Sequence, residues 1–114
     1  IGYLHASRYN GNTEGAAIEW IAKPSVDVKD RVVLLVEDIF DEGTTLKEIV
    51  NVLQNMGAQV VHTAALVNKV HDRKIKEFKV NYIGVDVPDR YIFGCGMDYH
   101  EYWRNLPGIW ALKE

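Results

Sequence analysis

A run of acidic residues followed by a glycine and two threonines stands in the middle of the sequence. The segment Val32–Val36 is continuously apolar, and the segment Glu37–Thr45 that follows it has the sequence EDIFDEGTT. Carboxylates accept hydrogen bonds from sugar hydroxyls and bind divalent cations, whereas main-chain amides at the start of a helix bind phosphate. Packing alone does not require such a run of acids. The segment therefore predicts a site for a sugar phosphate with a bound divalent cation.

The elements around this segment are those of an α/β unit. The apolar run Val32–Val36 predicts a strand that is buried on both faces, as in a parallel sheet. Apolar residues with a helical spacing predict a helix from about Thr45 to Gly57, where Gly is a typical C-terminal stop. A strand is expected again at Val60–Val67. Because α/β sheets bind ligands beyond the carboxyl ends of their strands, the acids stand where a ligand is expected.

Other segments are assigned by composition and turn signals. Thr45 and Glu48 match a capping box at the start of the expected helix. Asn10–Gly15 is expected to be a mobile loop, and His71–Glu77 a solvated loop or a short helix. Further strands are expected at residues 1–9, 17–22, 80–85, 91–94 and 109–112, the last of which is expected to close the sheet.

Length and composition predict one small soluble domain. The chain has 114 residues, 47% of them hydrophobic and 25% charged, and a net charge of −3, which argues against non-specific nucleic-acid binding. No apolar run approaches the ~18 residues of a membrane span, and no secretory signal is recognised. Cys95 is the only cysteine, which excludes an internal disulfide and fits the cytoplasm. Because the chain starts at Ile1 and not at Met, we expect a processed product or a fragment.

Several single residues are candidates for chemistry, each with an ordinary structural alternative. Asp41 is a candidate general base or acid. Lys69 follows a strand at its carboxyl end, although a lone lysine there is usually a solvated charge. Tyr91 has the type of a core aromatic residue. Asp98 and Arg104 flank an aromatic patch, and their simplest interpretation is a surface ion pair of little energetic value.

These motifs resemble those of a known family. Val33–Thr45 resembles the hallmark of the type I phosphoribosyltransferases, with Glu42 at a position that is usually small or Thr. Ala65–Lys69 resembles the purine-contacting lysine segment of the hypoxanthine-guanine phosphoribosyltransferases. Val87–Pro107 resembles the base-stacking and metal-binding tail of the same family, and the resemblance covers nearly the whole chain.

The resemblance implies a fold and an activity. The fold would be α/β, the parallel-sheet type I phosphoribosyltransferase fold without its N-terminal part, so that residues 1–114 form the C-terminal two-thirds of the family domain. Roughly 60–70 further residues would precede Ile1 in full-length members, and they would supply one wall of the pocket. The implied reaction is purine salvage, in which phosphoribosyl pyrophosphate and hypoxanthine or guanine give a nucleotide and pyrophosphate.

The resemblance also implies roles for the residues that would hold phosphoribosyl pyrophosphate. Glu37 and Asp38 would bind the ribose 2- and 3-hydroxyls. Asp98 would coordinate Mg²⁺ on the pyrophosphate, and Arg104 would contact that leaving group. The 5-phosphate would be held by the amides and hydroxyls of Glu42, Gly43, Thr44 and Thr45.

For the purine, the resemblance implies a second set of contacts. Asp41 would handle the proton at N7, and Lys69 would hydrogen-bond O6, which selects oxopurines over adenine. Tyr91 would stack on the base, and the main chain of Ile92 would contact its edge. Tyr9 resembles a tyrosine of the loop that closes over the site.

Alternatives remain open at this point, and one position departs from the family. Arg8 stands where many members have Ser. A xanthine-preferring enzyme, a non-catalytic regulator of the same fold and a phosphatase or receiver domain are the alternatives; the last leaves the tail from Tyr91 to Arg104 unexplained. The resemblance further implies a cytoplasmic homo-oligomer, a dimer or tetramer, without nucleic-acid or membrane partners.

Overall fold

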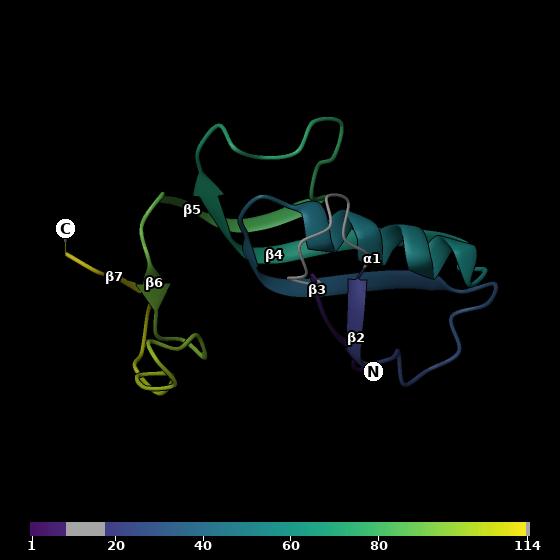
Figure 1. Ribbon diagram of the computed structural model, residues 1–114, viewed down its shortest axis with the longest axis horizontal. Coiled ribbons are helices and arrows are strands. Elements are labelled where there is room, and N and C mark those ends of the chain that lie inside the picture. The colour runs from purple at the N-terminus through teal and green to yellow at the C-terminus, as the bar shows by residue number, and fades with distance from the viewer. Residues whose placement is uncertain (9–17, 114) are drawn as a thin grey trace.

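A computed structural model describes residues 1–8 and 18–113 of the chain. The expected loop Asn10–Gly15 and the candidate residue Tyr9 lie outside the described residues. In this part of the chain the strands form three separate sheets, and a single helix packs on the largest of them (Figure 1).

The largest sheet is parallel, as the sequence predicts. It consists of β3 (Val32–Phe40), β4 (Val60–Val70) and β5 (Tyr82–Pro88), in the order β3-β4-β5. In the register of β3 with β4, Phe40 lies opposite Asn68. Asp41 directly follows β3, whereas Lys69, which the sequence analysis places after its strand, is the second-last residue of β4 and still pairs with Val87 of β5. Both residues therefore lie at the same edge of the sheet.

The helix α1 (Thr44–Asn55) begins one residue earlier than the sequence predicts, and its N-cap residue is Gly43. Gly43 has φ +91°, and a Cβ atom there would lie 2.7 Å from the ring of Phe40, so that the turn requires glycine. No side chain caps the helix. The predicted capping box of Thr45 and Glu48 is thus wrong, because Thr45 already lies inside the first turn, where its side chain is not in the N-cap position.

The other end of α1 follows the prediction. The amide of Gly57 donates to the carbonyl of Gln54, and the amide of Ala58 donates to the carbonyl of Leu53. Gly57 has φ +97°, which is the left-handed conformation that glycine adopts after a helix. The helix therefore ends where the sequence places its stop.

Hydrophobic packing covers one face of the parallel sheet. Ile49 and Leu53 of α1 are buried against the half-buried Val33 and Leu35 of β3. A second cluster joins Leu46 of α1 to the sheet through buried Phe40 and Ala65. In the described part of the chain, no helix is both long and apolar enough to cross a lipid bilayer.

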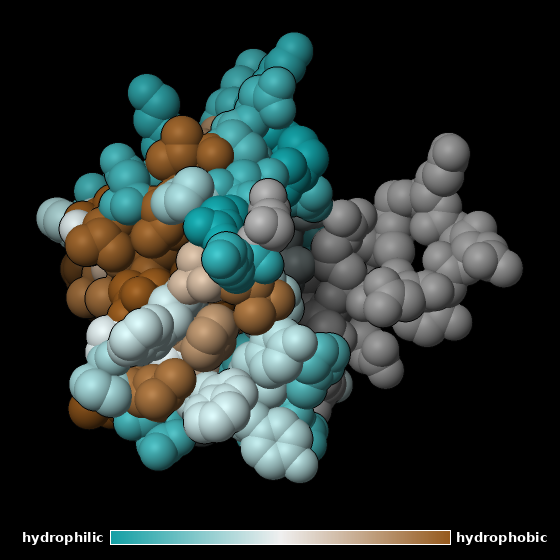
Figure 2. Space-filling view, turned by 90° about the vertical axis from the view of Figure 1, so that its left-hand side faces the viewer, coloured by the Kyte–Doolittle hydropathy of each residue, from teal (hydrophilic) through white to brown (hydrophobic). Residues whose placement is uncertain are grey.

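The opposite face of β3 is exposed, so the prediction of a strand buried on both faces is wrong. Val32, Leu34 and Val36 are 63%, 56% and 70% exposed. Alternate residues of a strand point to opposite faces, and α1 covers only the face of Val33 and Leu35. Hydrophobic side chains gather on one side of the molecule in the view of Figure 2.

Each of the two smaller sheets is a pair of antiparallel strands. β1 (His5–Arg8) pairs with β2 (Ile18–Ala22). β6 (Ile92–Phe93) pairs with β7 (Trp110–Ala111) in a sheet of its own, at the left of Figure 1, and Ile92 packs against Val67 of β4. The prediction that residues 109–112 close the main sheet is wrong, because the chain leaves the sheet after β5 and packs against its end.

The core of α1 gives a direct stability test. Leu53 is 1% exposed, and Leu53→Ala should lower the free energy of unfolding of this chain by ~2–5 kcal/mol, because it removes buried methyl groups and leaves a cavity. Leu34→Ala makes the same change on the exposed face of β3 and should cost far less. Urea denaturation of both variants checks the difference, and equal losses would contradict the packing described here.

Candidate functional site

The predicted phosphate segment forms a pocket at the carboxyl edge of the parallel sheet. The pocket has a volume of about 310 Å³. It lies where β3 has ended and α1 begins, and amides in the first turn of a helix lack acceptors within the helix. These amides and the helix dipole favour an anion. Six predicted site residues line the pocket: Glu37, Asp41, Glu42, Gly43, Thr44 and Thr45.

Glu37 and Asp38 lie within β3, and not after it as the sequence analysis places them. Their side chains leave opposite faces of the strand, Glu37 half-buried and Asp38 exposed. Each accepts a hydrogen bond from the main chain: Asp38 N donates to Glu37 Oε1 at 3.1 Å, and Ile39 N donates to Asp38 Oδ1 at 2.7 Å.

The environment of Glu37 favours its protonated form. Burial raises the pKa of Glu37 from 4.5 to about 7, and the neighbouring Asp38 adds to the shift through a side-chain hydrogen bond and charge repulsion. Glu37 therefore changes its charge close to neutral pH.

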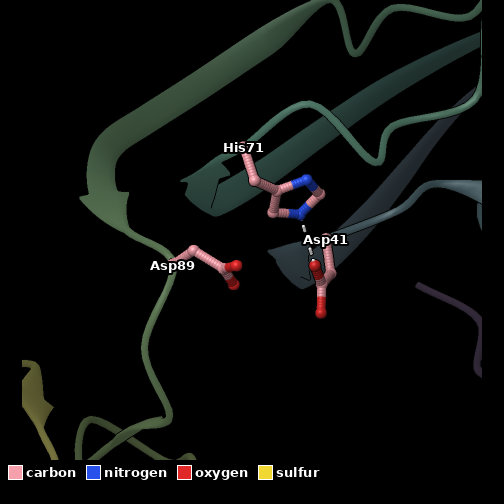
Figure 3. A group of neighbouring side chains, drawn as sticks. All are labelled: Asp41, His71 and Asp89. Carbon is pink, nitrogen blue, oxygen red and sulfur yellow. Dashed lines mark hydrogen bonds and ion pairs between the residues drawn. The ribbon is translucent and has the colours of Figure 1, made fainter. Parts of the chain in front are cut away.

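Asp41 stands at the centre of a group of basic side chains, of which Figure 3 shows His71. The Nε2 atom of His71 lies 2.6 Å from Asp41 Oδ1, and the Nζ atom of Lys69 lies 3.9 Å from Asp41 Oδ2. Asp41 is about half exposed, whereas Lys69 and His71 are mostly buried. The structure thus brings together two residues that the sequence predicts, Asp41 and Lys69, and adds a third, His71.

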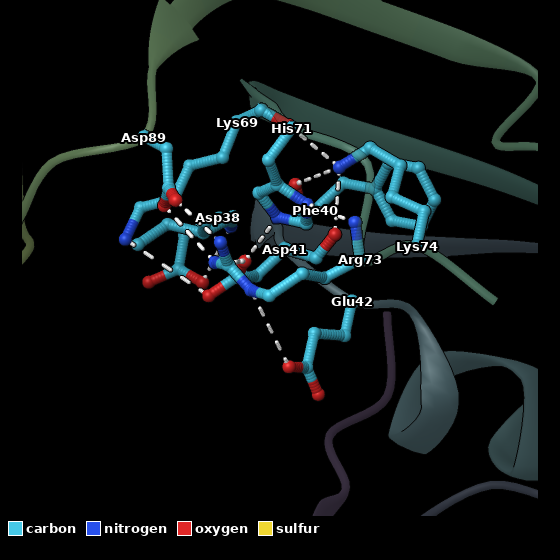
Figure 4. A network of polar contacts seen from close by, with 10 residues as sticks. Asp38, Phe40, Asp41, Glu42, Lys69, His71, Arg73, Lys74 and Asp89 are labelled. Atoms are coloured by element: carbon cyan, nitrogen blue, oxygen red, sulfur yellow. Dashed lines mark hydrogen bonds and ion pairs between the residues drawn. The ribbon is translucent and has the colours of Figure 1, made fainter.

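A network of charged side chains that the sequence analysis missed surrounds Asp41 (Figure 4). The guanidinium of Arg73 donates to both carboxylate oxygens of Asp89, which lowers the pKa of Asp89, and lies 3.8 Å from Asp41 Oδ1. Lys74 Nζ donates to the carbonyls of Phe40, Asp41 and Lys69, and burial lowers the pKa of Lys74.

Of the two forms expected for His71–Glu77, the structure shows a loop, and most of its residues are exposed, but the expectation that the segment is solvated is wrong for the side chain of His71. No helix forms there, and the His71 side chain is only 4% exposed. The available signal was the basic sequence His71-Asp72-Arg73-Lys74, which follows Lys69 directly at a strand end.

The predicted residues of the tail form a second group. Tyr91 is exposed, and its hydroxyl donates to the carbonyl of Asp98 at 3.1 Å. Arg104 NH2 lies 3.8 Å from Asp98 Oδ2, at the distance of a weak ion pair. Ile92 is buried and pairs with Ala111, and its contact with a purine edge stays a prediction.

A larger cavity connects the tail with the acids of β3. Its volume is about 990 Å³, and both Arg104 and the pair Glu37 and Asp38 line it. The side chain of Arg104 can therefore face a ligand that is bound by Glu37 and Asp38.

Two groups of side chains have the chemistry of a cation site. Asp98 offers a half-exposed carboxylate, and Mg²⁺ is usually held by one or two carboxylates together with substrate phosphates. Asp41, His71 and Asp89 have ligand atoms that all lie within 4.8 Å of one another. Arg73 already contacts both acids of this second group, so its negative charge is compensated within the chain.

A parallel sheet with tandem acids and a phosphate-binding helix start at its carboxyl edge is typical of α/β proteins that bind phosphorylated ligands. The comparison with known families agrees with this class. The family model described as "Phosphoribosyl transferase domain" matches residues 1–100, and the chain belongs to this family.

Within this family, the chain is similar to several purine phosphoribosyltransferases. The chain is 37% identical to a hypoxanthine-guanine phosphoribosyltransferase of Staphylococcus epidermidis, over 99% of this chain and 63% of that protein. A crystal structure of a hypoxanthine phosphoribosyltransferase from Staphylococcus aureus superimposes with a TM-score of 0.87 at 34% identity, over 99% of this chain and 61% of that one. A crystal structure of a hypoxanthine-guanine phosphoribosyltransferase from Bacillus anthracis superimposes with a TM-score of 0.88 at 29% identity, over 99% of this chain and 66% of that one. The predicted fold class is thus confirmed, and the chain spans less than two thirds of the curated relatives.

The pKa of Glu37 gives a prediction for stability. The folded chain holds this proton up to about pH 7, whereas the unfolded chain releases it near pH 4.5, so that Glu37 costs stability as the pH rises through this window. Glu37→Gln should therefore raise the melting temperature at pH 8 and leave it nearly unchanged at pH 4. Thermal unfolding at both pH values measures this.

The matched control is Glu77→Gln, which removes one negative charge at an exposed position. A Glu37→Gln effect of equal size at pH 4 and pH 8 would contradict the raised pKa.

Proposed function

We propose that the protein to which this chain belongs transfers the phosphoribosyl group of phosphoribosyl pyrophosphate to hypoxanthine or guanine and releases pyrophosphate. The observation that carries the proposal is the pairing of Asp41 Oδ2 with Lys69 Nζ, 3.9 Å apart, beside the phosphate-binding turn. The names of the relatives support it, since all three are purine phosphoribosyltransferases.

In this proposal the purine edge faces Asp41 and Lys69. A 6-oxopurine carries O6 next to N7, whereas adenine carries an amino group in place of O6. The ammonium of Lys69 can donate to O6 but offers no acceptor for the amino group, which favours oxopurines. The carboxylate of Asp41 accepts the hydrogen of N7.

The reaction then needs one proton acceptor. As the purine N9 forms its bond to the anomeric carbon, the bond from that carbon to the pyrophosphate oxygen breaks. The purine becomes positively charged, and its N7 proton passes to Asp41. A positioned general base contributes ~10²–10⁴-fold to such a step.

The sugar phosphate would lie along the turn between β3 and α1. Glu37 and Asp38 accept hydrogen bonds from the ribose hydroxyls. The 5-phosphate binds the amides and hydroxyls of Glu42, Gly43, Thr44 and Thr45, where no side chain competes as a helix cap.

The tail would complete the site. Asp98 is the residue that would hold Mg²⁺, and bound Mg²⁺ neutralises charge on the pyrophosphate. Arg104 binds the same leaving group through its guanidinium. The exposed ring of Tyr91 stacks on the purine, and the main chain of Ile92 contacts its edge.

We further infer the setting of this domain. Residues 1–114 form the C-terminal two-thirds of a phosphoribosyltransferase domain, the protein works in the cytoplasm, and it assembles as a homo-oligomer. An assay of nucleotide formation with hypoxanthine, guanine and xanthine, using this chain and the full-length gene product, tests the proposal; the absence of any product would refute it.

The role of Asp41 predicts a loss of turnover. Asp41→Asn keeps the size of the side chain but removes the proton acceptor, so kcat should fall ~10²–10⁴-fold while the KM for both substrates changes little. Steady-state kinetics measures this. Asp72→Asn, the same change at an exposed neighbour, should leave kcat unchanged, and a normal rate for Asp41→Asn would remove Asp41 as the base.

The role of Lys69 predicts a change in specificity. Lys69→Ala should weaken the discrimination in favour of hypoxanthine and guanine over adenine by ~1–3 kcal/mol, since it removes the donor to O6. Values of kcat/KM for the three bases provide the comparison. Lys76→Ala is the exposed control, and equal losses on all three bases would contradict a role at O6.

A further inference from the structure

His71 is a buried imidazole that the proposed contacts with substrate do not use. It follows β4 and lies directly behind Asp41, with its side chain 4% exposed (Figure 3). A buried polar side chain is expected to have partners for its ring nitrogens, because an unsatisfied one is costly. Both nitrogens of His71 have such partners.

The hydrogen bonds of His71 determine its tautomer. The amide of Arg73 donates to Nδ1 at 3.0 Å, so Nδ1 carries no proton. In the neutral ring the proton is then on Nε2, which lies 2.6 Å from Asp41 Oδ1 and donates to it. His71 is therefore a hydrogen-bond donor to Asp41 with a fixed direction.

This donor distinguishes the two oxygens of Asp41. The terminal torsion of an aspartate is broad, so a free carboxylate rotates between orientations. The bond from His71 engages Oδ1, while Oδ2 faces Lys69 at 3.9 Å. Within the described part of the chain, no hydrogen bond engages Oδ2, which leaves that oxygen available to a ligand.

We propose that His71 is a positioning residue that orients the carboxylate of Asp41, so that Oδ2 is presented to the purine N7 beside Lys69. This inference rests on the proposed function, because it assigns His71 a task in the same reaction. The hydrogen bond from His71 to Asp41 resembles those in other catalytic groups, in which a further residue orients the general base.

The segment that carries His71 is itself anchored to the sheet. The amide of Ile75 donates to the carbonyl of Glu42 at 2.9 Å, and Lys74 bridges the ends of β3 and β4 through three carbonyls. The imidazole is thus held against Asp41 by contacts that do not depend on a ligand. An orienting group must be held in this way, because a misplacement of ~1 Å can cost ~10²-fold in rate.

A bound cation is the rival interpretation of this group, since Asp41, His71 and Asp89 lie close together. The guanidinium of Arg73 contacts both acids and brings a positive charge of its own. The tautomer of His71 also argues against a bound cation, because a metal ion on Nε2 would displace the proton of the hydrogen bond to Asp41.

The kinetic test uses two substitutions in the full-length gene product. His71→Leu removes the donor and should lower kcat ~10²-fold, with the KM for phosphoribosyl pyrophosphate unchanged. His71→Gln places an amide donor near the position of Nε2 and should restore most of the rate. His62→Leu, at a histidine of β4 outside the site, should keep the wild-type rate.

A double-mutant cycle separates positioning from a general loss of structure. In the Asp41→Asn background, His71→Leu should cost little more, because its effect acts through Asp41. Equal losses for the Leu and Gln variants, or a full additional loss in the Asp41→Asn background, would overturn the proposal.

Nitrogen-15 NMR of the imidazoles in a chelator-treated sample tests the tautomer of His71 without an enzyme assay. The expected spectrum has a protonated Nε2 and a non-protonated Nδ1 for the neutral ring. The opposite tautomer, or an Nε2 that loses its proton when Zn²⁺ is added, would refute the assignment. Failure of the proposed function has a different signature: a wild-type protein with this tautomer that forms no nucleotide from any purine.

Discussion

The parallel pairing of β3 with β4 is the constraint on which the site depends. Parallel strands end at the same edge of a sheet, and the register that sets Phe40 opposite Asn68 makes the two strands deliver Asp41 and Lys69 side by side. A shift of one residue would turn alternate side chains to the other face. The packing of α1 on Val33 and Leu35 resists that shift, because it would bury the wrong residues.

The charges at this edge are balanced within the chain. Asp41 lies among the positively charged Lys69 and Arg73, and Lys74 compensates the carbonyl dipoles at the ends of both strands. The carboxylate is therefore oriented before a ligand arrives, which lowers the reorganisation that a reaction would require. The turn at Gly43 adds the complementary feature, free amides for an anion, a few residues away.

The sequence predicted the parts of the fold that local patterns determine. The helical spacing from Leu46 to Met56 and the stop at Gly57 located α1 to within a residue, and the motif Glu37–Thr45 located the pocket. It did not predict the exposed face of β3, because an apolar run does not reveal how many layers cover a strand. The contacts of His71 were also missed: they join residues 30 positions apart and depend on how the segment folds back. The roles of the site residues stay predictions.

The proposed function requires that the edge formed by β3 and α1 hold an activated pentose while a purine replaces its pyrophosphate. A crystal structure with phosphoribosyl pyrophosphate and Mg²⁺ tests it most directly. The 5-phosphate is expected on the amides of the Glu42–Thr45 turn, with the anomeric carbon on the side of Asp41. A ligand bound elsewhere on the protein, or a Glu42–Thr45 turn closed by its own side chains, would contradict it.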